Sequence, residues 1–293
     1  MEQASSKPVI TIETLVNAKI DKVWAYWTEP AFIMRWNAAS DDWHTTFSVN
    51  DLRPGGKFIS KMEAKDGSFG FEFWGIYDKV EPFTLIESTM GDGRKMKVEF
   101  IEEGDKTKVI ESFEAEGENS LELQRTGWQA ILNNFGKFAE TNAGSVLLKF
   151  EKTINANPEK VFKTMISKEG YHQWTAPFNP TSTFEGNWEK GTKILFVGTD
   201  ENGQKGGMVG KVKENRPYEF LGIEYTGLLQ GENEITEGPE VESWVGSMES
   251  YWFFPEGNGT KVVVNLESNQ DFLSFFQESW PKALDILKNI SEK

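Results

Sequence analysis

The sequence predicts an α+β protein of two similar domains, each an antiparallel, curved sheet of six or seven strands wrapped around a long closing helix. Three observations lead to this fold class. The chain repeats its own motifs in the same order, at a spacing that is the size of a whole domain. Each copy begins with a strand and short amphipathic helices and continues with strands separated by hairpin turns. Each copy ends with a helix that has one apolar stripe.

The repeat defines the domain boundaries. The segment N-A-K-I-D-K-V-W at Asn17–Trp24 corresponds to N-A-N-P-E-K-V-F at Asn155–Phe162. Later, E-G-D-K-T-K-V from Glu103 corresponds to E-G-N-G-T-K-V from Glu256. Single positions also correspond: Trp36 with Trp174, Gly75 with Gly210, Pro82 with Pro217, and Trp128 with Trp280. We therefore predict domains over residues 8–142 and 146–293, joined within residues 140–146 by a short polar linker.

Each copy opens with a strand that leads into a helix. The predicted strands are Val9–Val16 and Val146–Ile154. Asp21 stands at the entry to the first helix, and Pro158 occupies the first turn of the second, where its missing N–H costs nothing. Helical spacing places these side chains on one apolar face: Val23, Trp24 and Trp27 in the first copy, and Val161, Phe162 and Met165 in the second.

Turn residues then separate the strands. Asp66-Gly67 and Asn202-Gly203 are dipeptides typical of tight hairpins, because both tolerate positive φ. Gly75 and Gly210 fall in mid-strand, where glycine indicates a bulge or bend. Apolar and charged residues alternate over 95–100, which indicates a strand with one wet and one buried face.

Each copy closes with an amphipathic helix whose stripe must be buried, and the concave face of the sheet is the available partner. The stripes are Leu121, Trp128, Leu132, Phe135 and Ala139 in the first copy, and Leu273, Trp280, Leu284 and Leu287 in the second. We expect both Trp128 and Trp280 to be buried.

Composition excludes several classes of protein. The formal net charge is −15 and there is no cysteine, so disulfide and thiolate chemistry are absent. So acidic a chain is a poor match for nucleic acid or anionic lipid, whose binding depends on Lys and Arg. The N-terminal residues lack a signal-peptide pattern, and no apolar run is long enough for a membrane span. We expect a cytoplasmic protein.

The ordered motifs resemble the START-like, helix-grip (SRPBCC) superfamily, and within it the family similar to the activator of the heat-shock protein 90 ATPase, as a tandem duplication. The resemblance rests on Val23-Trp24, Trp36, Pro54-Gly55-Gly56, Asp66-Gly67, Gly75 with Pro82, and Gly127-Trp128. The second copy departs from it at two motifs, reading E-K-G at the P-G-G turn and S-W in place of G-W. The resemblance implies a cavity between sheet and closing helix that holds a small hydrophobic or amphipathic molecule.

The side chains expected in these cavities are mostly aromatic and aliphatic, a combination typical of small-molecule sites but also of solid cores. In the first domain they are Phe58, Met62, Phe71, Phe73, Met96, Val98 and Trp128. In the second domain they are Phe196, Met208, Tyr251, Phe253, Gln277 and Trp280.

Two charged residues fall at buried positions of the first domain. Glu111 occupies the apolar register of the last strand, and Arg125 lies on the stripe of the closing helix. An unpaired buried charge is costly, so we expect these groups to pair or to meet water or ligand. An alternative is that Arg125 extends to the cavity rim with no ligand role. Gln277 and Val264 occupy the matching positions of the second domain, so its ligand should differ.

Signals for an enzyme are poor, and we expect neither a cofactor nor a metal. The two histidines, His44 and His172, lack partners at metal-ligand spacing. His44 is near the cavity mouth if the resemblance holds, but is more typical of a surface residue. Two alternatives to a binding protein stay open. One is a co-chaperone or stress-response module that binds a chaperone or another protein. The other is a cyclase- or dehydratase-like enzyme, for which Glu111 and His44 are the candidate acid or base.

The second copy carries an acidic insertion between Thr226 and Trp244, where the first copy makes a tight turn at 91–93. Long insertions are commonly either functional flaps or disordered loops. We expect a partly ordered flap over the second cavity.

Overall fold

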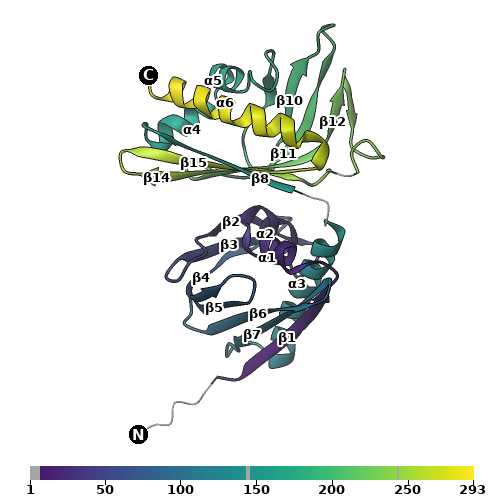
Figure 1. Cartoon of the computed structure of the whole chain (residues 1–293), viewed down its shortest axis with the longest axis vertical. Helices are drawn as coiled ribbons and strands as arrows, with labels where there is room; N and C mark the ends of the chain where they lie inside the picture. Colours follow the sequence, from purple (N-terminus) through teal and green to yellow (C-terminus); the bar gives the residue numbers. More distant parts are fainter. Residues whose placement is uncertain (1–6, 143–145, 243) are drawn as a thin grey trace. The chain divides into compact units, whose positions relative to one another are not determined.

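The computed structural model describes residues 7–142, 146–242 and 244–293, and it divides the chain into two compact units, Met1–Ala143 and Gly144–Lys293 (Figure 1). Each unit has its own sheet and closing helix. The predicted junction within residues 140–146 includes 143–145, which lie outside the described residues.

The first unit is one antiparallel sheet, two short helices and a long closing helix. Its sheet has the order β1-β7-β6-β5-β4-β3-β2, so the first and last strands are neighbours. The elements are β1 (Val9–Val16), α1 (Ile20–Thr28), α2 (Pro30–Trp36), β2 (Trp43–Asn50), β3 (Lys57–Ala64), β4 (Gly70–Glu81), β5 (Leu85–Met90), β6 (Lys95–Glu103), β7 (Lys106–Glu114) and α3 (Leu121–Thr141).

The second unit repeats this plan with one more strand. Its sheet runs β8-β15-β14-β12-β11-β10-β9, and β13 pairs with β12 off this path. The prediction of six or seven strands is wrong here, because the insertion contributes β13. The elements are β8 (Val146–Ile154), α4 (Pro158–Ile166), α5 (Lys168–Trp174), β9 (Thr183–Gly186), β10 (Lys193–Thr199), β11 (Lys205–Arg216), β12 (Phe220–Gln230), β13 (Asn233–Ile235), β14 (Met248–Glu256), β15 (Gly259–Ser268), the 3-10 helix η1 (Gln270–Phe272) and α6 (Leu273–Ser291).

The repeated N-A motif has the same hydrogen bonds in both units. The backbone N–H of Asn17 donates to the Glu140 carboxylate at the end of α3 over 2.9 Å. In the second unit Asn155 donates to Glu292 at the end of α6 over 2.7 Å. These bonds join the residue after the first strand to the end of the closing helix at the same place in each unit.

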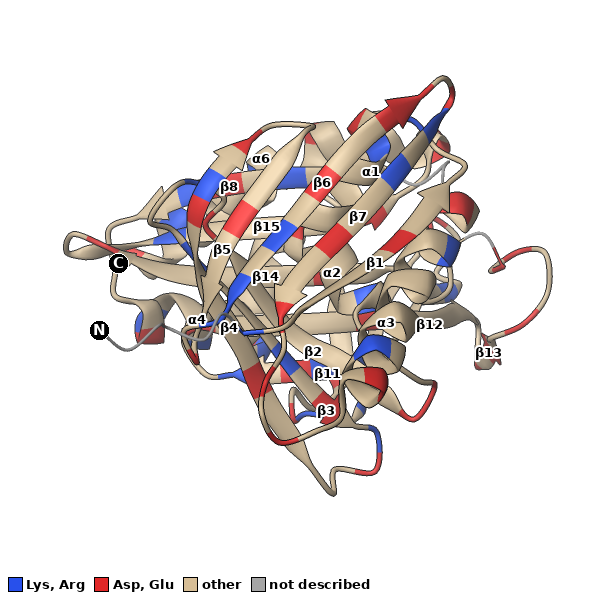
Figure 2. Cartoon of the chain, turned by 90° about the horizontal axis from the view of Figure 1, so that it is seen from below, with Lys and Arg blue, Asp and Glu red and all other residues tan. Residues whose placement is uncertain are grey.

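The solvent face of the first sheet is charged, as the alternation over 95–100 predicted. Figure 2 shows charged residues alternating with uncharged ones along β6 and β7. Lys95 and Lys97 bind Asp78 and Glu99, with Nζ–O distances of 3.2 and 2.9 Å. Val98 in the same strand is fully buried. The polar face therefore leaves the other face of the sheet to form the core and the cavity.

The two mid-strand glycines have different structural roles. Beside Gly210 the β11–β12 register shifts, as expected for a bulge. The same expectation is wrong for Gly75, which pairs regularly with Phe58, while the register shift follows at Tyr77. A Cβ on Gly75 would lie 2.6 Å from the Phe58 ring, so glycine is needed there for packing.

The closing helices bury most of the predicted stripes. Leu132, Phe135 and Ala139 of α3 are buried, as is Trp280 of α6. Two expectations for α3 are wrong. Leu121 is 49% exposed because it is the first residue of the helix, and Trp128 is only partly buried because it lies beside an open cavity.

Candidate functional site

The first unit contains a cavity of about 290 Å³. Of the side chains predicted for it, Phe58, Met62, Phe71, Phe73, Met96, Glu111 and Trp128 line the cavity. Val98 is in the solid core instead and does not line it. Trp128 forms one wall, stacked on Phe113 of β7 with ring centroids 4.1 Å apart and meeting Phe73 edge to face.

Glu111 is the acidic group of this cavity. It is 6% exposed and stands on β7, opposite Ile12 of β1 and Val98 of β6. No hydrogen bond or ion pair to its carboxyl group occurs among the described residues, and burial raises its pKa to about 8. At neutral pH the carboxyl group is therefore mostly protonated and can donate a hydrogen bond to a guest.

Arg125 does not accompany Glu111. Its side chain is exposed and donates to the backbone oxygen of Thr11 over 2.7 Å, and it is not part of the cavity wall. Pairing with Glu111, one of the outcomes expected for Arg125, does not occur, because the guanidinium group reaches across β1 to a backbone acceptor. Arg94 lines the cavity in its place.

Two interactions hold the Arg94 side chain in place. Its guanidinium group contacts the Asp92 carboxylate at 2.7 Å and donates to the backbone oxygen of Glu114 over 3.0 Å. Sequence reasoning missed it because it follows the Gly91-Asp92-Gly93 turn, where no periodic pattern indicates the direction of a side chain.

The second unit contains a larger cavity of about 960 Å³. Phe196, Met208 and Trp280 line it, as predicted. Tyr251, Phe253 and Gln277 do not. Tyr251 and Phe253 are buried in the core, and Gln277 is exposed on the outer side of α6.

Aromatic rings form much of this second wall. Phe178 meets Trp280 edge to face with centroids 5.0 Å apart, and Trp174 lies 5.9 Å from Trp280. Tyr171 stacks on Phe196 at 6.0 Å. The rings come from α5, the segment after it, β10 and α6, so the closing helix and the sheet both shape the cavity.

Two buried acids, Glu249 and Glu267, line the second cavity, and Glu249 has hydrogen bonds to two tyrosines. Glu249 lies on β14 and accepts a hydrogen bond at Oε2 from the Tyr225 hydroxyl over 2.8 Å, while the Tyr251 hydroxyl donates to Oε1. Burial raises the pKa of Glu249, and the two tyrosine hydrogen bonds act in the opposite direction. Burial, followed by the charge of Glu249, also raises the pKa of Tyr225 and of Tyr251.

Sequence reasoning missed Glu249, although a signal was present. Glu249, Tyr251 and Phe253 alternate along one strand, and the two aromatic residues were predicted to point inward. Glu249, like Glu111, is a carboxyl group in the apolar register of a strand.

The insertion is folded where it is described. It extends β12 and adds β13 as a hairpin, in which Leu228 faces Ile235 across the ladder. Leu228, Glu240 and Trp244 line the second cavity. Where the insertion is described, it consists of the β12–β13 hairpin and of later residues, Glu240 and Trp244, at the cavity wall.

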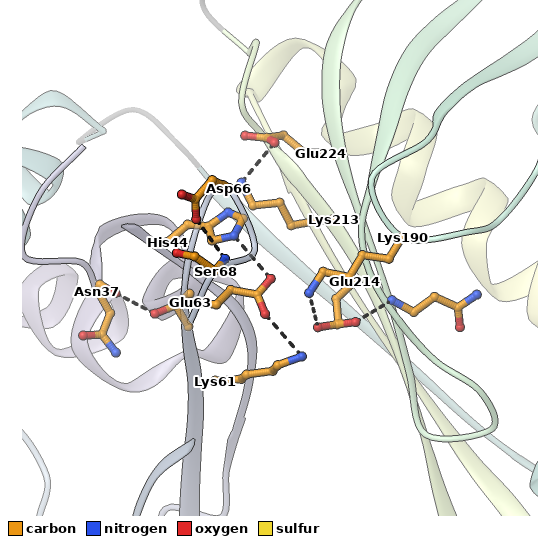
Figure 3. Close-up of polar contacts among 12 residues, drawn as sticks. Asn37, His44, Lys61, Glu63, Asp66, Ser68, Lys190, Lys213, Glu214 and Glu224 are labelled. Carbon is orange, nitrogen blue, oxygen red and sulfur yellow. Dashed lines mark hydrogen bonds and ion pairs between the residues drawn. The ribbon is translucent and has the colours of Figure 1, made fainter. Parts of the chain in front are cut away.

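The histidines lie outside both cavities. His44 contacts Glu63 with an Nε2–Oε1 distance of 3.4 Å, across the β2–β3 ladder (Figure 3). His172 is exposed, with Nδ1 2.9 Å from the backbone oxygen of Ser182. Within the described ranges no acidic and histidine side chains form a group suited to a metal ion. Among those same residues, no helix has the length and apolar character needed to cross a bilayer.

Comparison with known proteins agrees with the repeat. The model of the family described as Activator of Hsp90 ATPase homolog 1-like protein matches residues 17–140 and again residues 155–292. No curated protein matches the chain.

Solved structures of two kinds are similar. An AHSA1-like protein from Aeromonas hydrophila is 45% identical, covering 46% of this chain and 94% of its own, with a TM-score of 0.45. A protein from Cytophaga hutchinsonii is 52% identical over 46% of this chain and 93% of its own, with a TM-score of 0.41. The di-domain ARO/CYC StfQ from the steffimycin biosynthetic pathway is 11% identical, covering 97% of this chain and 98% of its own, with a TM-score of 0.51. This last likeness shows that the tandem fold occurs in another chain.

Proposed function

The chain belongs to the family of Activator of Hsp90 ATPase homolog 1-like proteins, and we propose that it binds small, largely apolar molecules in its two cavities. The observation that carries the proposal is common to both units. Each has a cavity with aromatic walls that include buried carboxyl groups, Glu111 in the first and Glu249 and Glu267 in the second.

The dimensions support this proposal. Small-molecule sites typically have volumes of roughly 300–1,000 Å³, apolar walls and a few polar groups that orient the guest. The first cavity, at about 290 Å³, suits a compact guest, and the second, at about 960 Å³, suits a larger one. Glu111 and Glu249 lie on different strands, β7 and β14, so the two guests should differ in where their polar atoms lie.

Glu111 also favours a second candidate function, that of a cyclase- or dehydratase-like enzyme. A carboxyl group with a pKa of about 8 inside an apolar cavity is suited to donate a proton near neutral pH. Such an enzyme would show turnover of a guest that the first cavity binds, and Glu111→Gln would abolish turnover while retaining most binding.

Methionine methyl groups offer a test of binding in each cavity. Met62 and Met96 line the first cavity and Met208 lines the second, whereas Met165 is buried on α4 and belongs to neither wall. We expect decanol to shift the methyl NMR signals of the lining methionines and to leave Met165 unchanged. Unchanged signals at all three lining methionines, with decanol and with extracts of the protein's own host, would overturn the proposal. Native mass spectrometry of the protein from that host would then reveal whether it retains a protein partner instead.

A further inference from the structure

We propose that the second cavity selects organic cations, that is, an amine or quaternary ammonium group attached to an apolar body. This inference rests on the proposed binding function and specifies its ligand class for one of the two sites. It follows from the charges around the cavity, the position of the buried Glu249 carboxyl group and the rings that line the same cavity.

The charges that line the second cavity are almost all negative. Five acidic residues belong to its wall: Asp200, Glu240, Glu249, Glu267 and Asp271. Lys205 is the single basic residue among the described lining residues, and its Nζ lies 3.1 Å from Glu185 and 3.6 Å from Glu232. Its charge is thus already matched by carboxylates outside the wall, and the field inside the cavity favours a cation.

Glu249 supplies a hydrogen-bond acceptor at depth. It is 9% exposed, and both of its oxygens accept from tyrosine hydroxyl groups. Two such donors stabilise the ionised carboxylate against the cost of burial. Tyr225 belongs to the cavity wall, whereas Tyr251 holds the carboxyl group from the core side. Among the described residues no basic group forms an ion pair with Glu249, so a bound cation would supply the counter-charge of its ionised form.

Aromatic rings in the wall of the second cavity also favour a cation. Tyr171, Trp174, Phe196 and Trp280 line the same cavity as Glu249. Rings attract cations through their quadrupoles, and tryptophan does so most strongly. An anionic head group would instead meet five carboxyl groups, and a neutral one would gain only hydrogen bonds. The first cavity differs, because Arg94 lines it together with Glu111.

The experiment compares three head groups on one apolar chain. Decyltrimethylammonium, decanol and decanoate are titrated into the full chain below their micellar concentrations. The Met208 methyl signal follows the second cavity, and Met62 and Met96 follow the first. We expect the quaternary ammonium to bind at Met208 at least about tenfold more tightly than decanol. A desolvated cation–π contact together with a charge contact contributes an affinity gain of about this size. Decanoate should bind there most weakly.

Variants then assign the selectivity to Glu249. In Glu249→Gln the preference for the cation over decanol at Met208 should fall by about tenfold, while decanol binds nearly as before. Glu256→Gln is the matched control, since Glu256 is exposed on the same strand β14 and the same charge is removed far from the cavity wall. Its cation preference should equal that of the wild type.

The outcomes separate the two proposals. If neither the three probes nor extracts of the host shift a lining methionine, the binding function itself fails. If decanol or decanoate binds at Met208 as tightly as the cation, the cavity is a binding site without cation selectivity and the inference is overturned. An undiminished cation preference in Glu249→Gln overturns it as well.

Discussion

The Thr107 hydroxyl donates a hydrogen bond to the backbone oxygen of Ala18 over 2.9 Å, and both residues are buried. Thr260 makes the equivalent bond to Ala156 over 2.7 Å in the second unit. The bond joins the start of the last strand to the loop after the first. It gives a reason for the threonine that begins the T-K-V segment in both copies, and it joins that segment to the residue after each N-A asparagine.

We therefore expect Thr107→Val to lower the free energy of unfolding by about 1–3 kcal/mol, because the change keeps the shape but leaves a buried carbonyl oxygen unpaired. Urea denaturation measures the effect. Thr84→Val is the control, since its hydroxyl bonds to Glu81 at the exposed surface. Equal denaturation midpoints for the two variants would contradict the role given to the bond.

The two matching tryptophans should differ in their contribution to stability. Trp280 is 2% exposed and packs against four rings, so Trp280→Ala should cost roughly 3–5 kcal/mol. Trp128 lies partly exposed at the first cavity, so Trp128→Ala should cost less and chiefly weaken decanol binding at Met96. Thermal denaturation and methyl NMR test the pair, and equal losses of stability would contradict the assignment.

Glu111 should make stability fall as pH rises. Its pKa is about 8 in the folded chain and 4.5 as the ordinary value, so the folded state binds more protons between these two values. The stabilisation is present below about pH 4.5 and is lost as pH rises through about 8. The free energy of unfolding of wild type minus that of Glu111→Gln should therefore decrease over this range by up to a few kcal/mol. Glu249 titrates in both proteins, so its contribution cancels. A flat or rising difference would show that Glu111 is ionised in the fold.

The insertion should close on a guest of the second cavity. Trp244 lines that cavity from the loop after β13, so Trp244→Ala should weaken binding at Met208 by up to about tenfold and leave Met96 unaffected. Val245→Ala is the control, since Val245 is the exposed neighbour and is not part of the wall. Hydrogen exchange over residues 228–242 should slow when decyltrimethylammonium binds and stay unchanged when a guest occupies the first cavity. Exchange that is fast in every condition would identify the segment as a solvated loop.

Local patterns in the sequence determined the fold class. Alternation, hairpin dipeptides and helical stripes depend on residues that are close together in the chain. Because the chain contains a repeat, each of these patterns occurs in both copies. The inward register of β7 likewise identified Glu111 as a buried acid, which the structure places in a cavity wall.

Only the tertiary structure decided which inward side chains line a cavity and which pack against other side chains in the core. Val98, Tyr251 and Phe253 occupy inward positions but are buried in the core and line neither cavity. Phe253 packs against Phe162 of α4, and Tyr251 packs against Trp174 and Trp280. Arg125 shares a helical stripe with Trp128, yet its long side chain reaches the backbone of β1. Glu249 meets Tyr225 only when β12 and β14 pair, a contact between segments far apart in the chain. Periodicity gives the direction of a side chain, whereas the packing of distant elements decides what that side chain meets.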